Sequence, residues 1–195
     1  MNTPAHMLIG AALFARRDRP ALTLAALAGG LVPDLALLGM VQWAVRMRGI
    51  PESTIFGELY FGETWQRIFG ADHSFVLWGA VFVLALWFTR PAAAALAGAA
   101  LAHAAADFLL HHEDARRQFW PLSDWVFRSP VSYWDPARFG GIVAPVEAAL
   151  VLVLAALLLR RLRRWWERGL ILAVMTVQIL PVVLTGGFHG LHGLG

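Results

Sequence analysis

Three side chains that can bind a metal ion recur at helical spacing in the middle of the chain. His103, Asp107 and His111 are each separated by four residues. On a helix of about 3.6 residues per turn they share one face and climb about 12 Å along it. A neutral imidazole and a carboxylate are good ligands for zinc, iron or manganese. The spacing predicts either a metal site or an intramembrane His–Asp hydrogen bond that joins two helices.

The composition around these residues is typical of a membrane protein. Of 195 residues, 58% are hydrophobic and 15% charged, with a mean hydropathy of +0.60, whereas about a quarter of a soluble domain is charged. The absence of cysteine excludes a disulfide scaffold, cysteine-ligated metals and a cysteine nucleophile. Every basic residue is an arginine, and the arginines separate apolar runs instead of forming one face, so we expect no nucleic-acid partner.

The apolar runs predict an all-α polytopic bundle that forms a single membrane domain over residues 1–195. A first run, Pro4–Ala15, is too short to cross a hydrocarbon core of about 30 Å and predicts a partial span. Pro33 removes a backbone donor inside the second run and predicts a kinked or broken helix with Asp34 near the break. About five spans are expected, at Ala21–Val45, Phe75–Thr89, Ala92–Leu110, Ile142–Leu159 and Gly169–Thr185.

This threading predicts which parts of the chain share a side of the membrane. The densest arginine links, residues 16–19, 90 and 160–168, fall on one side, which the positive-inside rule makes cytoplasmic. Residues 1–112 then hold the candidate metal-site helices, 113–141 form an aromatic non-cytoplasmic loop, and 142–195 form a helical pair and tail. Several histidines converge on the non-cytoplasmic side, namely His6, His73, His111, His112, His189 and His192.

Four ionisable residues lie inside the apolar runs and require an explanation, because each costs about 2.5–3.5 kcal/mol at mid-membrane. They are Asp34, His103, Asp107 and Glu147. Asp34 needs a cation or a hydrogen-bond donor, and Glu147 needs the same or an arginine of the long loop. His73 lies at the mouth of the third run, at a height where it could join a metal site.

The loop at 113–141 is dense in aromatic residues, which favour the membrane–water interface. The loop could anchor the protein among membrane lipids, or it could cover the polar mouth as a lid and handle an amphipathic small-molecule substrate. In the second case Arg116 and Arg128 could meet a phosphate, and Trp120 could contact the substrate.

A succession of short motifs carries a family resemblance. The chain resembles the LexA-regulated, metal-dependent hydrolases of the bacterial inner membrane (the YdjM-like family), which are distantly similar to zinc-dependent phospholipase C. The match runs from residue 3 to about residue 125. Its motifs are Thr3-Pro4-Ala5-His6, Gly30-Leu31-Val32-Pro33-Asp34, His73-Ser74, His103 with Asp107, and Pro121-Leu122-Ser123.

The resemblance implies a divalent metal cofactor, zinc by analogy with the phospholipase, and a location in the bacterial inner membrane. It also implies a ligand set, namely His6, Asp34, His73, His103 and Asp107, with His111 or His112 as additions. Ala36 stands where the family has a second acid, which predicts fewer ligands and either a weaker or mononuclear site or a site that has lost catalysis.

Two functions follow from these observations. The first is a membrane-embedded, metal-dependent hydrolase acting on a phosphoester or lipid-like substrate at the non-cytoplasmic interface. The second is a non-catalytic multi-pass protein, such as a partner subunit of another membrane protein, a scaffold or a small-solute carrier, in which buried polar residues pair with one another. Geometry separates them, because one ion cannot join His6, His73 and His103 if their side chains lie more than about 8 Å apart.

Overall fold

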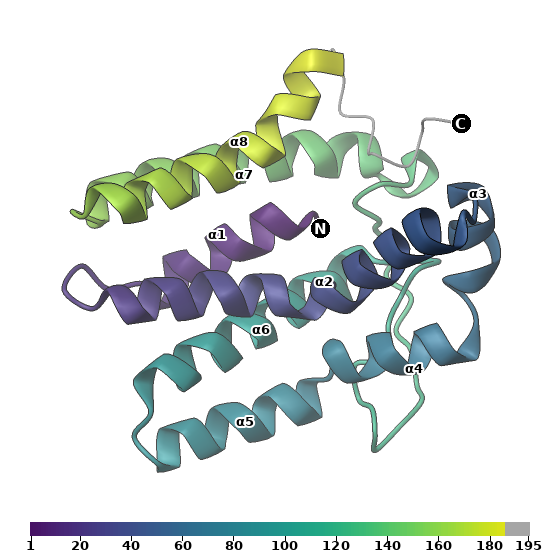
Figure 1. Cartoon of the computed structure of the whole chain (residues 1–195), viewed down its shortest axis with the longest axis horizontal. Coiled ribbons are helices and arrows are strands. Elements are labelled where there is room, and N and C mark those ends of the chain that lie inside the picture. The colour runs from purple at the N-terminus through teal and green to yellow at the C-terminus, as the bar shows by residue number, and fades with distance from the viewer. Residues whose placement is uncertain (186–195) are drawn as a thin grey trace.

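The computed structural model describes residues 1–185, a bundle of helices joined by short turns and one long irregular loop (Figure 1). His189 and His192 lie outside the described residues. The elements are α1 (Thr3–Phe14), α2 (Pro20–Arg48), α3 (Glu52–Thr54), the π-helix η1 (Ile55–Leu59), α4 (Glu63–Asp72), α5 (Phe75–Trp87), α6 (Pro91–Leu110), the 3-10 helix η2 (Pro136–Arg138), α7 (Gly140–Arg161) and α8 (Trp165–Thr185).

Within residues 1–185, five helical segments are long and apolar enough to cross a membrane. α4 and α5 together form one of them, Glu63–Trp87, and the others coincide with α2, α6, α7 and most of α8. This confirms the expected polytopic helical bundle, and the protein is a multi-pass membrane protein. The Glu63–Trp87 span begins with α4 and so extends N-terminal to the apolar run expected to begin at Phe75.

α1 occupies the middle of the bundle although it is too short to span a membrane (Figure 1). It packs against α2 and α6 on one side and against α7 and α8 on the other. Its buried residues Ala5, Leu8 and Ala11 join the apolar core formed with α7 and α8. Because α1 spans only about 18 Å, its first residues lie within the bundle, where they reach side chains of α2, α6 and α7.

Two glycines let α2 approach its neighbours closely. A Cβ on Gly29 would overlap the carbonyl oxygen of Leu96 in α6, and a Cβ on Gly30 would lie 2.6 Å from the His6 carbonyl oxygen in α1. Small residues allow this kind of close backbone contact between membrane helices. The packing brings polar side chains of the three helices to a common depth.

The break expected at Pro33 is absent, because α2 runs as one helix from Pro20 to Arg48. Pro33 removes one intrahelical donor, the one that the Gly29 carbonyl would otherwise receive. The neighbouring Gly30 carbonyl accepts a hydrogen bond at 2.8 Å from Nδ1 of His103 on α6. Packing against α1 and α6 on both sides of the proline keeps the helix continuous.

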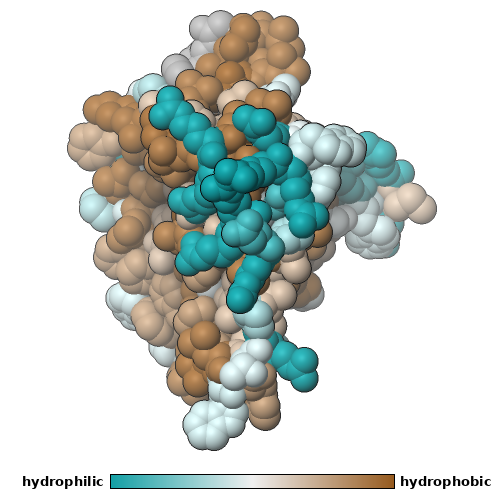
Figure 2. Space-filling model, turned by 90° about the vertical axis from the view of Figure 1, so that its left-hand side faces the viewer, coloured by the Kyte–Doolittle hydropathy of each residue, from teal (hydrophilic) through white to brown (hydrophobic). Residues whose placement is uncertain are grey.

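The arginine-rich links gather at one end of the bundle. In Figure 1 the α1–α2, α5–α6 and α7–α8 turns all lie at the left, whereas the N-terminus and the long loop lie toward the right. Figure 2 views the left end and shows hydrophilic residues clustered in the middle of a largely hydrophobic surface. The links therefore share one side, as the threading of the sequence predicts.

Candidate metal centre

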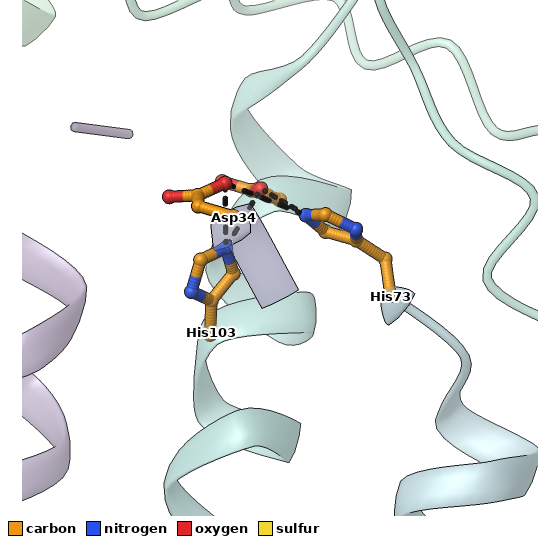
Figure 3. Close-up of side chains that lie close together, drawn as sticks. Asp34, His73 and His103 are labelled. Carbon is orange, nitrogen blue, oxygen red and sulfur yellow. Dashed lines mark ion pairs between the residues drawn. The ribbon is translucent and has the colours of Figure 1, made fainter. Parts of the chain in front are cut away.

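Four buried side chains from three helical segments meet at one point inside the bundle. Asp34 comes from α2, His103 and Asp107 from α6, and His73 from the end of α4. Each offers one ligand atom, and the four atoms lie within 4.8 Å of one another. Figure 3 shows the imidazoles of His73 and His103 pointing at the Asp34 carboxylate.

The distances between these atoms fit a shared ion better than direct hydrogen bonds. His103 Nε2 lies 3.3 Å from Asp107 Oδ2 and 3.6 Å from Asp34 Oδ1. His73 Nε2 lies 3.4 Å and 3.8 Å from the same two oxygens. Hydrogen bonds of this type are about 2.7–3.2 Å long, and neither Nε2 atom makes one. In a tetrahedral site with bonds of about 2.0–2.2 Å, neighbouring ligand atoms are about 3.3–3.6 Å apart. Three of the four distances fall in this range, and the distance from His73 Nε2 to Asp34 Oδ1 is longer, at 3.8 Å.

The backbone orients both imidazoles toward this point. Nδ1 of His103 lies 2.8 Å from the Gly30 carbonyl oxygen, and Nδ1 of His73 lies 3.2 Å from the Phe69 carbonyl oxygen. A histidine whose Nδ1–H donates to a carbonyl has its Nε2 lone pair free for a metal. Both rings are therefore held in the tautomer that a ligand requires.

The second oxygen of Asp107 meets a separate set of nitrogens. Its Oδ1 lies 2.9 Å from His6 Nε2, 3.0 Å from His111 Nε2 and 3.0 Å from the amino group of Met1. The His6 ring also stacks on His103, with centroids 3.6 Å apart. His6 and His111, both expected as ligands, thus contact Asp107 from outside the four-atom group and hold its carboxylate in place.

Two further residues of this surrounding layer were not expected as site residues. The Thr3 hydroxyl donates to Asp34 Oδ2 at 2.5 Å, and Asp114 Oδ2 lies 2.7 Å from His111 Nδ1. Burial alone would lower the pKa of His111, but the Asp107 carboxylate raises it above its usual value. Burial would raise the pKa of Asp114, but its hydrogen bond with His111 lowers it. Thr3 lies in the Thr-Pro-Ala-His motif, so the sequence did carry a signal for it.

Glu147, the remaining buried acid of the apolar runs, does not belong to the centre. Its Oε1 accepts hydrogen bonds from the Asn2 amide groups at 2.9 and 3.0 Å and from Gln178 Nε2 at 3.0 Å. The suggested pairing with an arginine of the long loop is therefore wrong. His112 also points elsewhere, with Nδ1 2.6 Å from the Ser129 carbonyl oxygen.

The three residues expected to bind substrate occupy different settings. Arg116 is buried, with its guanidinium over the rings of Tyr60 and Phe69 at 5.3 and 4.6 Å. In the described part of the chain its Nε and Nη1 have no hydrogen-bond partner. Trp120 is partly buried, and its carbonyl accepts a short hydrogen bond from Ser74, the residue that caps α5. Arg128 is exposed.

The Arg116 charge lies within electrostatic reach of the four-residue group. Burial would lower the pKa of Arg116, but Tyr60 and the carboxylates of Asp107, Asp34 and Asp114 raise it above its usual range. No carboxylate among residues 1–185 forms an ion pair with it at 4 Å or less. Arg116 is thus a charged side chain near two acids that it does not touch.

Aromatic packing fixes the long loop over the ends of α5 and α6. Phe108 of α6 contacts Phe119, Trp125 and Phe127 of the loop, with ring centroids 4.7–6.4 Å apart. Phe119 also contacts Phe75 at the start of α5. Leu122 and Trp125 remain exposed at the loop surface. The loop therefore has an anchored inner side and an apolar outer side, which suits either role expected for it.

In comparisons with known proteins, no family model, no curated protein and no solved structure matches the chain. The site is therefore characterised by its own geometry. The fold and the site define a multi-pass membrane protein with a buried Asp–His–His–Asp group that could hold a divalent metal ion.

Proposed function

We propose that the protein is a membrane-embedded, metal-dependent hydrolase of the bacterial inner membrane, acting on a phosphoester or lipid-like substrate at the non-cytoplasmic interface. One observation carries the proposal, namely the four ligand atoms of Asp34, His73, His103 and Asp107. Their charges and donor types suit zinc, and a catalytic ion would be held by three of the four groups, or by all four in an expanded shell, so that one position stays open for water. A bound ion of this kind would supply an activated water and polarise a phosphoryl oxygen.

The surroundings of the group support hydrolysis of an anionic ester. Arg116 offers a buried guanidinium with unused donors near the two acids, and guanidinium groups bind phosphate oxygens through paired donors. The aromatic loop covers the same end of α6 and presents apolar side chains at its surface. Its position suits an amphipathic substrate, with Trp120 and Arg128 as further contacts.

The arrangement of the arginine links supports the proposed side of the membrane. These links lie at the end of the bundle that holds the C-terminus of α1 (Figure 1). The candidate metal centre lies around the N-terminus of α1. By the positive-inside rule the centre then faces the non-cytoplasmic leaflet. The resemblance to the inner-membrane hydrolase family leads to the same membrane and the same reaction.

A second function has its own observation. Asp107 Oδ1 lies 2.9–3.0 Å from His6 and His111, and these are the distances of ordinary ion pairs. In a non-catalytic partner subunit, scaffold or carrier, such pairs would join helices without any ion. Metal content separates the two functions.

The test measures metal and hydrolysis together on the full chain purified in detergent. Elemental analysis gives the metal per chain, and bis(p-nitrophenyl) phosphate serves as the substrate. We expect about one bound ion and measurable hydrolysis, both lost in the double variant His103→Ala, Asp107→Ala. His112→Ala is the matched control, because this histidine bonds to the Ser129 carbonyl and not to the group. A wild-type chain without metal, or a double variant that retains it, would contradict the proposal.

A further inference from the structure

A hollow at the opposite end of the molecule is lined mainly by arginines. It has a volume of about 570 Å³ and is formed where the α1–α2 turn meets the end of α7. Its charged lining residues are Arg16, Arg17, Asp18, Arg19 and Arg161. Four positive charges therefore face one negative charge around a single depression, in the part of the surface that Figure 2 shows as hydrophilic.

The backbone fixes these side chains close together. Arg16 and Arg19 form a backbone bridge across the tight turn, with the Arg19 amide donating to the Arg16 carbonyl at 3.1 Å. Arg161 donates through Nη1 to the Ala12 carbonyl at 2.6 Å, which joins the end of α7 to the end of α1. Two helix ends 149 residues apart in sequence are thus held against each other.

The four arginines of the hollow form no ion pair within residues 1–185. The arginines that form ion pairs there are Arg67 and Arg117, which both contact Glu63, and Asp18 forms none. Charges of like sign held this close repel one another. An anion bound between them would relieve that repulsion, and several guanidinium groups together suit the oxygens of a phosphate group.

The position of the hollow favours a lipid as the source of that phosphate. Ala15 and Leu22 supply an apolar part of the lining. Leu13 and Leu24, nearby on α1 and α2, are exposed on the outside of the bundle. A phospholipid presents the same order of groups, with a charged head at the level of the helix ends and acyl chains along the helices. Basic pockets between membrane helices on the cytoplasmic side are known to receive such headgroups.

We propose that this hollow is a binding site for the phosphodiester headgroup of an anionic phospholipid. The site is independent of the candidate metal centre, because the 12-residue helix α1, about 18 Å long, separates the two. The inference therefore does not depend on the proposed hydrolase activity. The proposal assigns a specific lipid site to the α1–α2 turn and the end of α7. The positive-inside rule alone requires only that arginines lie on this face of the molecule.

The experiment uses the full chain in detergent and short-chain lipids as probes. Native mass spectrometry titrates binding of dihexanoyl-phosphatidylglycerol, dihexanoyl-phosphatidylcholine and inorganic phosphate. The test variant is Arg17→Gln, Arg19→Gln, whose side chains make no hydrogen bond within the described residues. The matched control is Arg163→Gln, Arg164→Gln, which removes the same charge from the same end of the molecule without altering the lining of the hollow.

We expect saturable binding of the phosphatidylglycerol probe, weakened ~30-fold in the test variant at about fivefold per arginine, and nearly unchanged in the control variant. Circular dichroism and metal content should be the same in both variants. Equal weakening in both variants would reduce the effect to diffuse surface charge and overturn the proposal. Equal binding of phosphatidylcholine would also overturn it. Displacement of the lipid by equimolar inorganic phosphate would assign the site to a soluble anion instead.

Discussion

Replacement of Asp107 by asparagine tests the centre most directly, because this residue connects both sets of nitrogens. Its Oδ2 belongs to the four-atom group, and its Oδ1 contacts His6 and His111 at 2.9 and 3.0 Å. Asp107→Asn keeps the size of the side chain and removes one negative charge. Two unit charges about 4 Å apart attract by about 4 kcal/mol at an effective dielectric of 20. Since 1.4 kcal/mol is tenfold in affinity, we expect metal binding to weaken by at least ~1,000-fold.

The assay is a metal titration in a chelator buffer, combined with thermal unfolding in the presence and absence of metal. A ligand at 100 times its Kd stabilises the folded state by about 2.7 kcal/mol. We expect wild-type protein to show this stabilisation and Asp107→Asn to lose it at the same metal concentration. Asp124→Asn, at an exposed loop position, is the control.

Two results would refute the reasoning about the centre. The first is a metal affinity of Asp107→Asn within tenfold of the wild-type value, which would remove the carboxylate from the ligand set. The second is an equal loss of stability with and without metal. That result would mean that Asp107 acts by pairing with His6 and His111 and not by binding an ion.

Three further predictions concern packing, substrate and titration. Gly29→Ala should destabilise the protein by about 1–3 kcal/mol through overpacking and lower its metal content. Gly39→Ala, whose added Cβ would have no atom within 4 Å, should stabilise the protein slightly. Equal melting temperatures of the two variants would contradict this prediction. Arg116→Gln should raise the KM for the phosphodiester roughly 10–100-fold and leave metal content unchanged; an unchanged KM would exclude Arg116 from substrate binding. Burial raises the pKa of Tyr60 to about 12 and that of Tyr133 well above its usual range, because it disfavours the charged phenolate. Absorbance at 295 nm should therefore show no tyrosinate step near pH 10 in folded protein and a full step in unfolded protein, and a step in the folded state would refute the burial of these side chains.

Local sequence patterns predict much of the candidate metal centre, because two of its four residues lie on one helix. His103 and Asp107 lie one turn apart on α6, and the structure brings their Nε2 and Oδ2 within 3.3 Å. Asp34 was identifiable because an acid inside an apolar run needs a partner. His73 was identifiable by its depth at the mouth of a span. In each case the signal was a polar residue placed where lipid or packed helices surround it.

The partners that depend on tertiary contacts could not be predicted. Asn2 and Gln178 donate to Glu147 Oε1 across 145 and 31 residues of sequence, and no local pattern joins these positions. The continuity of α2 through Pro33 was missed for a related reason. A proline weakens one turn of a helix, but the packing of that helix on its neighbours decides whether the helix continues.

The charges in the centre argue for an ion more strongly than the distances alone. Asp34 and Asp107 place two carboxylates in one buried group whose atoms lie within 4.8 Å of one another. At that separation two negative charges repel by about 3.5 kcal/mol at an effective dielectric of 20, and among residues 1–185 neither acid has an arginine within 4 Å. With His73 and His103 neutral, a divalent cation would balance the carboxylates that face them, as the interior of a membrane bundle requires. The Met1 amino group, His6 and His111 lie within 3.0 Å of Asp107 as well, but they contact Oδ1 and not the oxygen that faces His73 and His103. A protonated His73 or His103 could balance the charge too, but it would then make hydrogen bonds of about 2.7–3.0 Å to the acids. Nε2 of His73 and His103 instead lie 3.3–3.8 Å from both carboxylates, and this spacing leaves room for an ion between them.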